Sequence, residues 1–455
     1  MPDRLAVGIA RQIIREIYEQ HLPEGTLLGV EPELVVRYEV GRGVFREAVR
    51  ILEQSGVVAM QRGPSGGLIV RAPDVGHLAE SVAIFLLRRQ ATVSDLLEVR
   101  EAFESFAVES LCSSLEPDGV VQLRNHITDP ALIDDPMGRS DFHHILARLT
   151  PNRAVGLMCE LMVALMEEYS GSRRHVDRDL PAQVAEVHER LVHEIISGNV
   201  GEASALLRTD VREMGPQVLP ARESSLLTLE SARPGSKRAA SIARSILLKI
   251  LALGWPVGAN LGSQTDLMEE YEVSRAVLRE AMRLLENSQI AYMRKGHHGG
   301  LIVDEPGHDS VVAAVINHLR FRRVSATELS ELRVIVERLA VSKVIERSGS
   351  DLAPLSIDNS LDGAQALHIS VGQRSGNPLL ELLIAVQLEL REDDGSVSLG
   401  SEPEDWQLAH DAIESAMAAG DSALARYLMS RHIKDMSRTA RNGNQPQSEL
   451  TVIRG

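Results

Sequence analysis

Apolar residues recur at helical spacing along most of the chain. Ile9, Ile13 and Ile17 lie four residues apart within residues 3–20, and residues 236–253 show a similar pattern. Such spacing places apolar side chains on one face of an amphipathic helix. Helical patterns continue from about residue 74 and again from about residue 307, so we expect a mainly α-helical protein. The low share of aromatic residues, 3%, beside abundant Leu, Ala, Glu and Arg also favours helix.

The pattern occurs twice because the sequence repeats itself with a period of 233 residues. RGVFREAVRILE, from Arg42, and RAVLREAMRLLE, from Arg275, agree at 8 of 12 positions, and GGLIV occurs at 66–70 and 299–303. The register holds without a gap from Arg4 to Arg100, which falls on Arg333. Such self-similarity predicts a tandem duplication of a whole structural unit.

Each copy shows the same order of local signals. After the first helix, Pro and Gly at 23 and 25, or 256 and 258, predict a turn. A short helix is expected at 33–38 and 266–271, and a third helix begins after Gly41 or Ser274, the latter a good N-cap residue. The sequences VVAMQRGPSGGLIV and IAYMRKGHHGGLIV each predict a β-hairpin.

The third helix of each copy has an apolar face and an arginine face. The residues expected to face inward are Val44, Ala48, Ile51 and Leu52 in the first copy, and Val277, Ala281, Leu284 and Leu285 in the second. The arginines, four residues apart, are Arg42, Arg46 and Arg50, and Arg275, Arg279 and Arg283. The hairpin tips carry Arg62-Gly63 and Lys295-Gly296.

This layout is typical of a winged helix-turn-helix domain, whose second helix enters the major groove of double-stranded DNA. Guanidinium groups suit both phosphates and guanine edges, and Gly at the wing tip permits close approach to the DNA backbone. The alternative interpretation is a solvated helix face on which the arginines pair with Glu47, Glu53, Glu280 and Glu286.

The net charge of -16 would argue against a DNA partner if the acidic residues lay in the winged segments. Residues 1–72 carry nine basic and nine acidic residues, and residues 234–304 carry nine and seven, so the acidic excess lies elsewhere. No apolar run is long enough to span a bilayer, and the two cysteines, Cys112 and Cys159, lie in apolar helical segments. We expect a cytoplasmic protein without a membrane role.

The stretch from Pro23 through GTLLGVEPELVVRYEVGRGVFREAVRILEQSGVV to the GGLIV wing resembles the DNA-binding domain of the GntR superfamily, and the helical part resembles the ligand-binding (FCD) domain of its FadR subgroup. The resemblance implies DNA contacts from Arg42, Arg46, Arg275 and Arg279 and from the wing tips. Arg50 and Arg283, on the same helix faces, and Ser274 are further candidates for DNA binding. The chain departs from the family pattern at Pro32, Thr265 and Gly41. We call each winged helix-turn-helix domain a head, and these departures favour the second head as the one that binds DNA.

The resemblance also implies a metal site in the helical domains. The matching residues are His368, His410 and His432 in the second copy, and His143, His188 and Asp210 in the first. Ala364 and Arg139 stand where the family has an Asp, and neither Asp141 nor Asp362 has the family's spacing. Three imidazoles suit Zn or a similar divalent ion.

Arg100 and Arg333 also match the family's pattern. They could bind an acidic effector by bidentate contact, or each could form an ion pair with the glutamate four residues later, Glu104 or Glu337.

The sequence predicts four domains, a linker between the two copies and a C-terminal tail. They are a winged helix-turn-helix domain at 1–73, a helical FCD-like domain at 74–220, a linker at 221–236, a second winged helix-turn-helix domain at 237–306, a second helical FCD-like domain at 307–441 and a disordered tail at 442–455.

We expect a transcription regulator, a repressor by family resemblance, whose DNA affinity responds to a small-molecule effector such as an organic acid. Motifs of hydrolases, nucleotide-binding proteins and metalloproteases are missing from the sequence, so an enzyme is not expected. One chain would supply both heads as an intramolecular pseudo-dimer, with a homodimer also open. The alternative is a ligand- or metal-binding sensor or scaffold whose heads no longer bind DNA.

Overall fold

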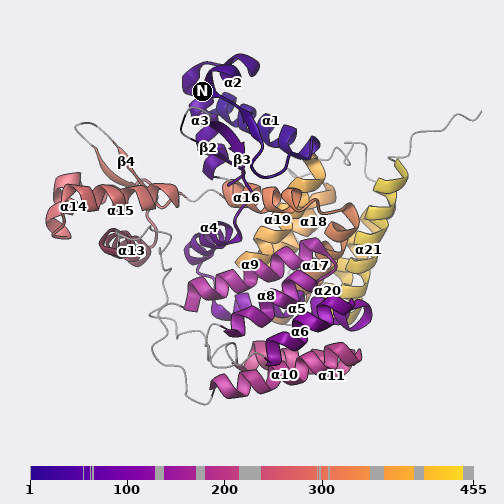
Figure 1. The fold of residues 1–455 in the computed structure, drawn as a ribbon. Helices are drawn as coiled ribbons and strands as arrows, with labels where there is room; N and C mark the ends of the chain where they lie inside the picture. The colour runs from indigo at the N-terminus through magenta and orange to yellow at the C-terminus, as the bar shows by residue number, and fades with distance from the viewer. Residues whose placement is uncertain are drawn as a thin grey trace, which may run out of the picture. The chain divides into compact units, whose positions relative to one another are not determined.

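The computed structural model shows a mainly helical chain with two small antiparallel sheets (Figure 1). It describes residues 2–54, 56–61, 63, 66–128, 138–170, 180–214, 237–294, 296, 299–305, 308–348, 363–393 and 404–443. The expected linker at 221–236 lies outside these residues. The expected tail at 442–455 also lies outside them, except for Asn442 and Gly443, which belong to the last helix. The domain boundaries stay predictions.

The first winged domain contains three helices and a three-stranded sheet. Its elements are α1 (Pro2–Glu19), β1 (Leu27–Gly29), α2 (Glu31–Arg37), α3 (Arg42–Gln54), β2 (Val58–Gln61) and β3 (Gly67–Val70). The strands pair antiparallel in the order β1-β3-β2, and the β2–β3 hairpin was predicted from the sequence. We did not predict β1, because three residues are too few to show an alternating pattern.

The second winged domain repeats this order with a smaller sheet. Its elements are α13 (Lys237–Ala252), α14 (Gln264–Glu270), α15 (Arg275–Asn287), β4 (Ala291–Arg294) and β5 (Gly300–Val303). At the position of β1, Asn260 and Ile302 form an isolated bridge. The predicted β4–β5 hairpin is confirmed, with pairing from Ala291 and Val303 to Arg294 and Gly300.

The buried face of the third helix differs from the prediction. The buried residues are Phe45, Ala48, Val49 and Leu52 in α3, and Leu278, Ala281, Met282 and Leu285 in α15. Val44 and Ile51, like Val277 and Leu284, are only half-buried. In the first copy, Val44 and Ile51 nevertheless pack against the core, so the predicted face does point inward, and Phe45 and Val49 extend it. Phe45 and its counterpart Leu278 are fully buried and thus contribute apolar surface to the core of each head.

The two helical domains consist of helices alone in the described part of the chain, with more elements in the first copy than in the second. The first contains α4 (Val75–Arg88), α5 (Val93–Ser114), α6 (Pro117–Thr128), α8 (Gly138–Leu149), α9 (Arg153–Ser170), α10 (Leu180–Ser197), α11 (Val200–Arg208) and the π-helix η1 (Thr209–Met214). The second contains α16 (His308–Phe321), α17 (Ala326–Ser348), α18 (Gly363–Arg374), α19 (Pro378–Asp393), α20 (Glu404–Ala418) and α21 (Ser422–Gly443).

The chain divides by packing into two units, and each unit contains residues of both copies. The first unit comprises residues 1–93 and 104–323, and the second comprises residues 94–103 and 324–455. The start of α5, which belongs to the first copy, therefore packs within the second unit. There the Asn377 side chain donates to the Asp95 carbonyl at 2.8 Å, and Arg347 contacts the Asp95 carboxylate at 2.8 Å.

Contacts between the copies also occur within the first unit. The Tyr18 hydroxyl of the first winged domain donates to the carbonyl of Asn317 on α16 at 2.9 Å. The Ser288 hydroxyl of the second winged domain donates to Glu80 on α4 at 2.9 Å. Each winged domain thus contacts the helix that follows the other winged domain.

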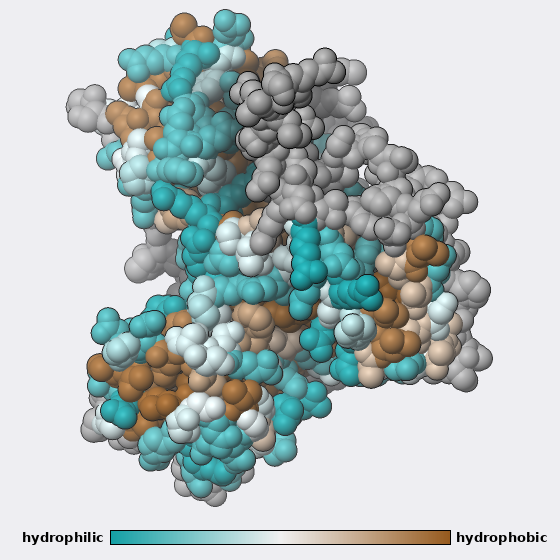
Figure 2. All heavy atoms as spheres, turned by 90° about the vertical axis from the view of Figure 1, so that its right-hand side faces the viewer, coloured by the Kyte–Doolittle hydropathy of each residue, from teal (hydrophilic) through white to brown (hydrophobic). Residues whose placement is uncertain are grey.

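The surface mixes hydrophilic and hydrophobic residues, as one face shows in Figure 2. Exposed apolar residues are scattered over many elements, which is normal for a folded protein and marks no particular site. Within the described ranges, no helix combines the length and the apolar character needed to cross a membrane.

Candidate DNA-binding helices and metal cluster

The arginine row of α3 lies on the exposed face of the helix, but two of its three members bind neighbouring carboxylates. Arg46 Nε lies 2.9 Å from Glu31 Oε1, and Arg50 Nη2 lies 2.5 Å from Glu47 Oε1. Arg42 is exposed at the start of the helix. The alternative interpretation as a solvated, paired face therefore describes part of α3.

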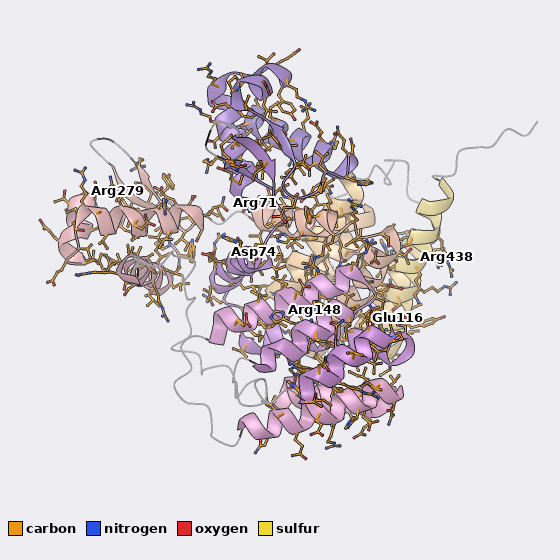
Figure 3. The ribbon with its side chains drawn as sticks, viewed as in Figure 1. Arg71, Asp74, Glu116, Arg148, Arg279 and Arg438 are labelled. Carbon is orange, nitrogen blue, oxygen red and sulfur yellow. The ribbon has the colours of Figure 1, made fainter. Side chains whose placement is uncertain are left out.

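The arginine row of α15 is less engaged. Arg283 contacts Glu280 at 2.6 Å, as Arg50 contacts Glu47. Arg275 and Arg279 are exposed, and neither has an ion-pair partner in the described part of the chain. Figure 3 shows Arg279 on α15. Glu31, which binds Arg46, corresponds in the repeat to Gln264, which carries no charge.

The helix starts also differ between the heads. Ser274 caps α15 by accepting a hydrogen bond from the backbone N–H of Val277 at 3.4 Å. Gly41 has no side chain with which to cap α3. In the preceding helix, Ser263 and Asp266 form a capping box on α14, whereas Val30 gives α2 no side-chain cap and Pro32 lies in its first turn. The second head thus has the better defined local geometry.

The glutamates at the ends of α3 and α15 do not pair with the arginine rows, contrary to the alternative considered above. Glu53 Oε1 accepts a hydrogen bond from the Met60 backbone N–H, and Glu286 Oε1 accepts one from the Met293 N–H, both at 2.9 Å. Each glutamate therefore fixes the first strand of a wing against the recognition helix.

The wing tips are only partly described. Gly63 and Gly296 have φ values of 124° and 111°, a region that favours glycine, so these positions form tight turns. Arg62 and Lys295, which we expected to contact DNA, lie outside the described residues.

Three buried imidazoles converge in the second helical domain. His368 comes from α18, His410 from α20 and His432 from α21, and their nearest ring nitrogens lie within 4.8 Å of one another. Nε2 of His410 lies 3.0 Å from Nε2 of His432, and the rings of His368 and His432 stack with centroids 5.4 Å apart. The sequence therefore identified three residues that the fold brings together.

A buried carboxylate, Glu337, contacts the His368 ring and so helps to fix the orientation of that ring. Glu337 on α17 contacts Nδ1 of His368 through one oxygen, and its other oxygen lies 2.5 Å from Nε of Arg333. Burial alone would raise the pKa of the Glu337 carboxyl, but Arg333 and His368 hold it well below its usual range. The predicted pair of Arg333 with Glu337 is present, and both residues are buried.

The electrostatic state of the cluster suits a metal ligand set. Burial, together with the nearby His368, lowers the pKa of His410 to about 4. Burial, His368 and His410 lower the pKa of His432 to about 3. Both rings are therefore neutral near pH 7, which is the form that coordinates metal. A carboxylate on the far nitrogen of a ligating His is the usual arrangement around zinc. The donor set thus fits a divalent ion such as Zn.

The equivalent cluster of the first copy has a different charge pattern. Its members are His143 on α8, His188 on α10 and Asp210 on η1, all buried. Nε2 of His143 and Nε2 of His188 each lie 3.3 Å from one oxygen of Asp210. Burial would raise the pKa of Asp210, but His188 and His143 lower it well below its usual value. Asp210 thus binds both imidazoles directly.

Sequence reasoning missed the second role of the glutamates on α5 and α17. We considered Glu104 and Glu337 only as partners of the arginines before them, but Glu104 Oε1 also lies 3.2 Å from Nδ1 of His143. His126 was missed as well, and its ring lies 6.4 Å from that of His188. Arg100 is buried, like Arg333. The side chains of Arg139, Asp141 and Ala364, and the whole of Asp362, lie outside the described structure.

Comparison with known families supports this interpretation of both heads. The model for bacterial regulatory proteins of the gntR family matches twice, at residues 5–66 and 238–298. The FCD domain model matches residues 95–213. The two gntR matches contain both arginine rows and lie in the register of the internal repeat.

Curated relatives resemble one copy of the chain. LutR, an HTH-type transcriptional regulator of Bacillus subtilis, is 24% identical over 41% of this chain and 88% of its own length. Rv0494, an uncharacterized HTH-type transcriptional regulator of Mycobacterium tuberculosis, is 28% identical over 38% of this chain and 72% of its own length. Among solved structures, the chain is similar to Streptococcus agalactiae GntR, with 20% identity, coverage of 47% and 98%, and a TM-score of 0.34.

The matched domains and named relatives are transcription regulators and not enzymes. Two gntR heads in the register of the repeat agree with the tandem duplication. The chain therefore belongs to the GntR family of bacterial regulatory proteins, as a DNA-binding transcription regulator with an effector-binding FCD domain.

Proposed function

We propose that this chain is a FadR-type repressor, acting in the cytoplasm, that binds a single asymmetric operator as an intramolecular pseudo-dimer. The observation that carries the proposal is that each packing unit contains residues of both copies. Members of symmetric regulator dimers place two identical heads on a pseudo-palindromic site. Here two diverged heads belong to one chain, so the two half-sites should differ in sequence.

The second head should contribute more to binding than the first. Arg275 and Arg279 have exposed guanidinium groups, whereas Arg46 of the first head already binds Glu31. A guanidinium must give up its carboxylate before it can bind a phosphate or a guanine, which reduces its net contribution. The specific DNA contacts assigned to both arginine rows and to the wing tips are part of this proposal.

The contacts between the copies support a single-chain assembly. Lys343 Nζ on α17 lies 2.8 Å from Glu98 on α5, next to the Asp95 contacts described above. In the first unit, Arg88 on α4 lies 2.5 Å from Glu305, which follows β5. These pairs link residues more than 200 positions apart, and all of them lie within one chain.

Light scattering on a short operator tests the stoichiometry. A complex of one chain with one duplex is expected over the whole range of protein concentration. An obligatory complex of two chains per duplex would refute the pseudo-dimer while leaving DNA binding itself intact.

We further propose that His368, His410 and His432 hold a divalent metal such as Zn, and that the bound ion helps to bind an acidic effector. The bound ion would act as a Lewis acid that attracts a carboxylate. Glu337 would hold the His368 ring in place, and Arg333 would keep Glu337 ionised. Zinc titration of the chelator-treated chain by calorimetry is expected to show one site that His432→Ala removes. Retained stoichiometric binding in that variant would exclude this ligand set.

A second candidate is a metal- or ligand-binding sensor whose heads have lost DNA binding. The Arg46–Glu31 pair and the net charge of -16 favour it. Fluorescence anisotropy with promoter DNA, for the wild type and Arg279→Ala across a salt series, separates the two. A regulator loses affinity steeply with salt, and the variant has a smaller slope. A sensor shows no sequence-dependent binding even at low salt.

A further inference from the structure

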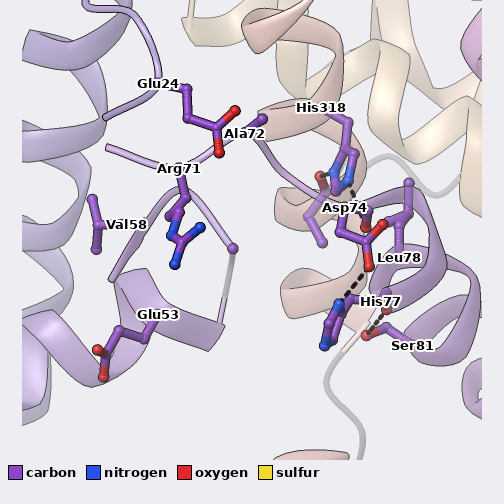
Figure 4. A pocket seen from close by; sticks show the side chains of 12 residues that line it. Glu24, Glu53, Val58, Arg71, Ala72, Asp74, His77, Leu78, Ser81 and His318 are labelled. Carbon is purple, nitrogen blue, oxygen red and sulfur yellow. Dashed lines mark hydrogen bonds and ion pairs between the residues drawn. The ribbon is translucent and has the colours of Figure 1, made fainter. Parts of the chain in front are cut away.

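A cleft lies between the base of the first winged domain and the helices α4 and α16, all within the first unit (Figure 4). Its volume is about 290 Å³, near the lower end of the range for small-molecule sites. We call it the head cleft. Glu24, Val58 and Arg71 line it on the side of the winged domain, and Leu78 and His318 line it on the side of the helices.

Most charged groups of the head cleft already have partners. Asp74 accepts hydrogen bonds from the Gly76 N–H at 3.3 Å and from His77 at 2.7 Å. Glu53 accepts one from the Met60 N–H. His318 is buried between two backbone carbonyls, those of Ala314 at 2.8 Å and Asp74 at 3.2 Å.

Arg71 and Glu24 are different. In the described part of the chain, neither side chain has a hydrogen-bond or ion-pair partner, and both line the cleft, as Figure 4 shows. A ligand with only a carboxylate would satisfy Arg71 but would meet an unmatched Glu24. A ligand with only an amine would do the reverse. A zwitterion can pair with both groups at once through charge-assisted hydrogen bonds.

The internal repeat provides a comparison within the same chain. In the repeat register, Glu24 corresponds to Val257, Arg71 to Asp304 and His318 to Phe85. The combination of Glu24 with Arg71 is therefore specific to the first head, because the second copy has Val257 and Asp304 at these positions. The hairpin and the glutamate that fixes it occur in both copies.

We propose that the head cleft binds a small aliphatic α-amino acid. Arg71 binds its carboxylate by a charge-assisted hydrogen bond, and Glu24 binds its ammonium group. Val58, Leu78 and Ala314 supply an apolar wall for the side chain. Because the lining comes from the winged domain and from α4 and α16, the ligand contacts the first head and its support together, at a place separate from both histidine clusters.

Calorimetric titration of the full chain with L-valine and L-leucine tests this proposal without DNA, so its outcome is independent of the proposed function. One saturable site is expected for at least one of the two amino acids. Isobutyrate and isobutylamine, which each lack one charged group, should bind at least about tenfold more weakly. Arg71→Gln and Glu24→Gln should each weaken binding by a similar factor.

Asp304→Asn, at the position of the second copy that corresponds to Arg71, is the matched control and should bind like the wild type. Both cleft residues are exposed, so unchanged thermal unfolding is expected for the variants and is measured in parallel. The proposal is overturned if neither amino acid binds at millimolar concentration. It is also overturned if isobutyrate binds as tightly as L-valine, or if Arg71→Gln leaves the affinity unchanged.

Discussion

Replacing Glu31 with Gln should strengthen DNA binding by the first head. Glu31 holds Arg46 at 2.9 Å, and the counterpart of Glu31 in the second head is Gln264. Glu31→Gln therefore gives the first head the residue that the second head already has. It releases the Arg46 guanidinium and removes a negative charge from the surface that should face phosphates.

The size of the effect follows from the exposure of the pair. The Arg46 side chain is 69% exposed and that of Glu31 is 29% exposed, so the ion pair contributes at most about 1 kcal/mol. Freeing Arg46 can therefore raise DNA affinity by up to about fivefold. One additional phosphate contact steepens the slope of log K against log salt by about 0.9. The cost in folding stability should be below about 1 kcal/mol.

Fluorescence anisotropy with a labelled promoter duplex, between about 50 and 200 mM salt, measures both quantities. The double variant Glu31→Gln with Arg46→Ala should lose the gain, and Gln264→Glu should weaken binding by the second head. If Glu31→Gln changes neither the affinity nor the slope, Arg46 does not contact DNA and the reasoning fails.

Three further predictions concern folding and ionisation. Ser274→Ala removes the cap of α15 and should cost about 1 kcal/mol of unfolding free energy, measured by urea denaturation. Phe45→Ala empties the core of the first head and should cost about 3–5 kcal/mol, whereas Val44→Ala, at a half-buried neighbour, should cost clearly less. His410 has a pKa of about 4 when folded and 6.5 as its ordinary value, so its contribution to stability is present above pH 6.5 and is lost as pH falls toward 4. Thermal unfolding in chelator should show this loss, and His410→Gln should show a flatter pH profile.

The repeat made the fold largely predictable from the sequence. Two copies of the same helical pattern, turn residues and Gly-rich hairpin fixed the order of elements in both heads, and the structure confirms that order. The exact buried face of α3 was not predictable, because Val44, Phe45, Ala48 and Val49 are all apolar and spacing alone does not rank them. The structure places Phe45, Ala48 and Val49 in the core and Val44 at its edge.

The candidate site was predictable only in part. The histidines of the second copy are far apart in the sequence, and their convergence agrees with the resemblance that suggested them. The contact of Glu337 with His368 was not predictable, because it joins two helices and its partners are 31 positions apart. The ion pair of Glu31 with Arg46, which competes with DNA for the arginine, likewise depends on how α2 and α3 pack. No local sequence pattern encodes that packing.

The start of α5 packs within the second unit and so joins the two copies. This joining affects how the two halves of such a regulator can evolve. In a homodimer every substitution appears twice, so a change that improves one half-site contact is also imposed on the other. Here Asp95, Arg347 and Asn377 join the copies inside one polypeptide, and each position is present once. The effective concentration of one half near the other is set by covalent connection and not by how much protein the cell makes. Each half is therefore free to specialise, even when the regulator is scarce.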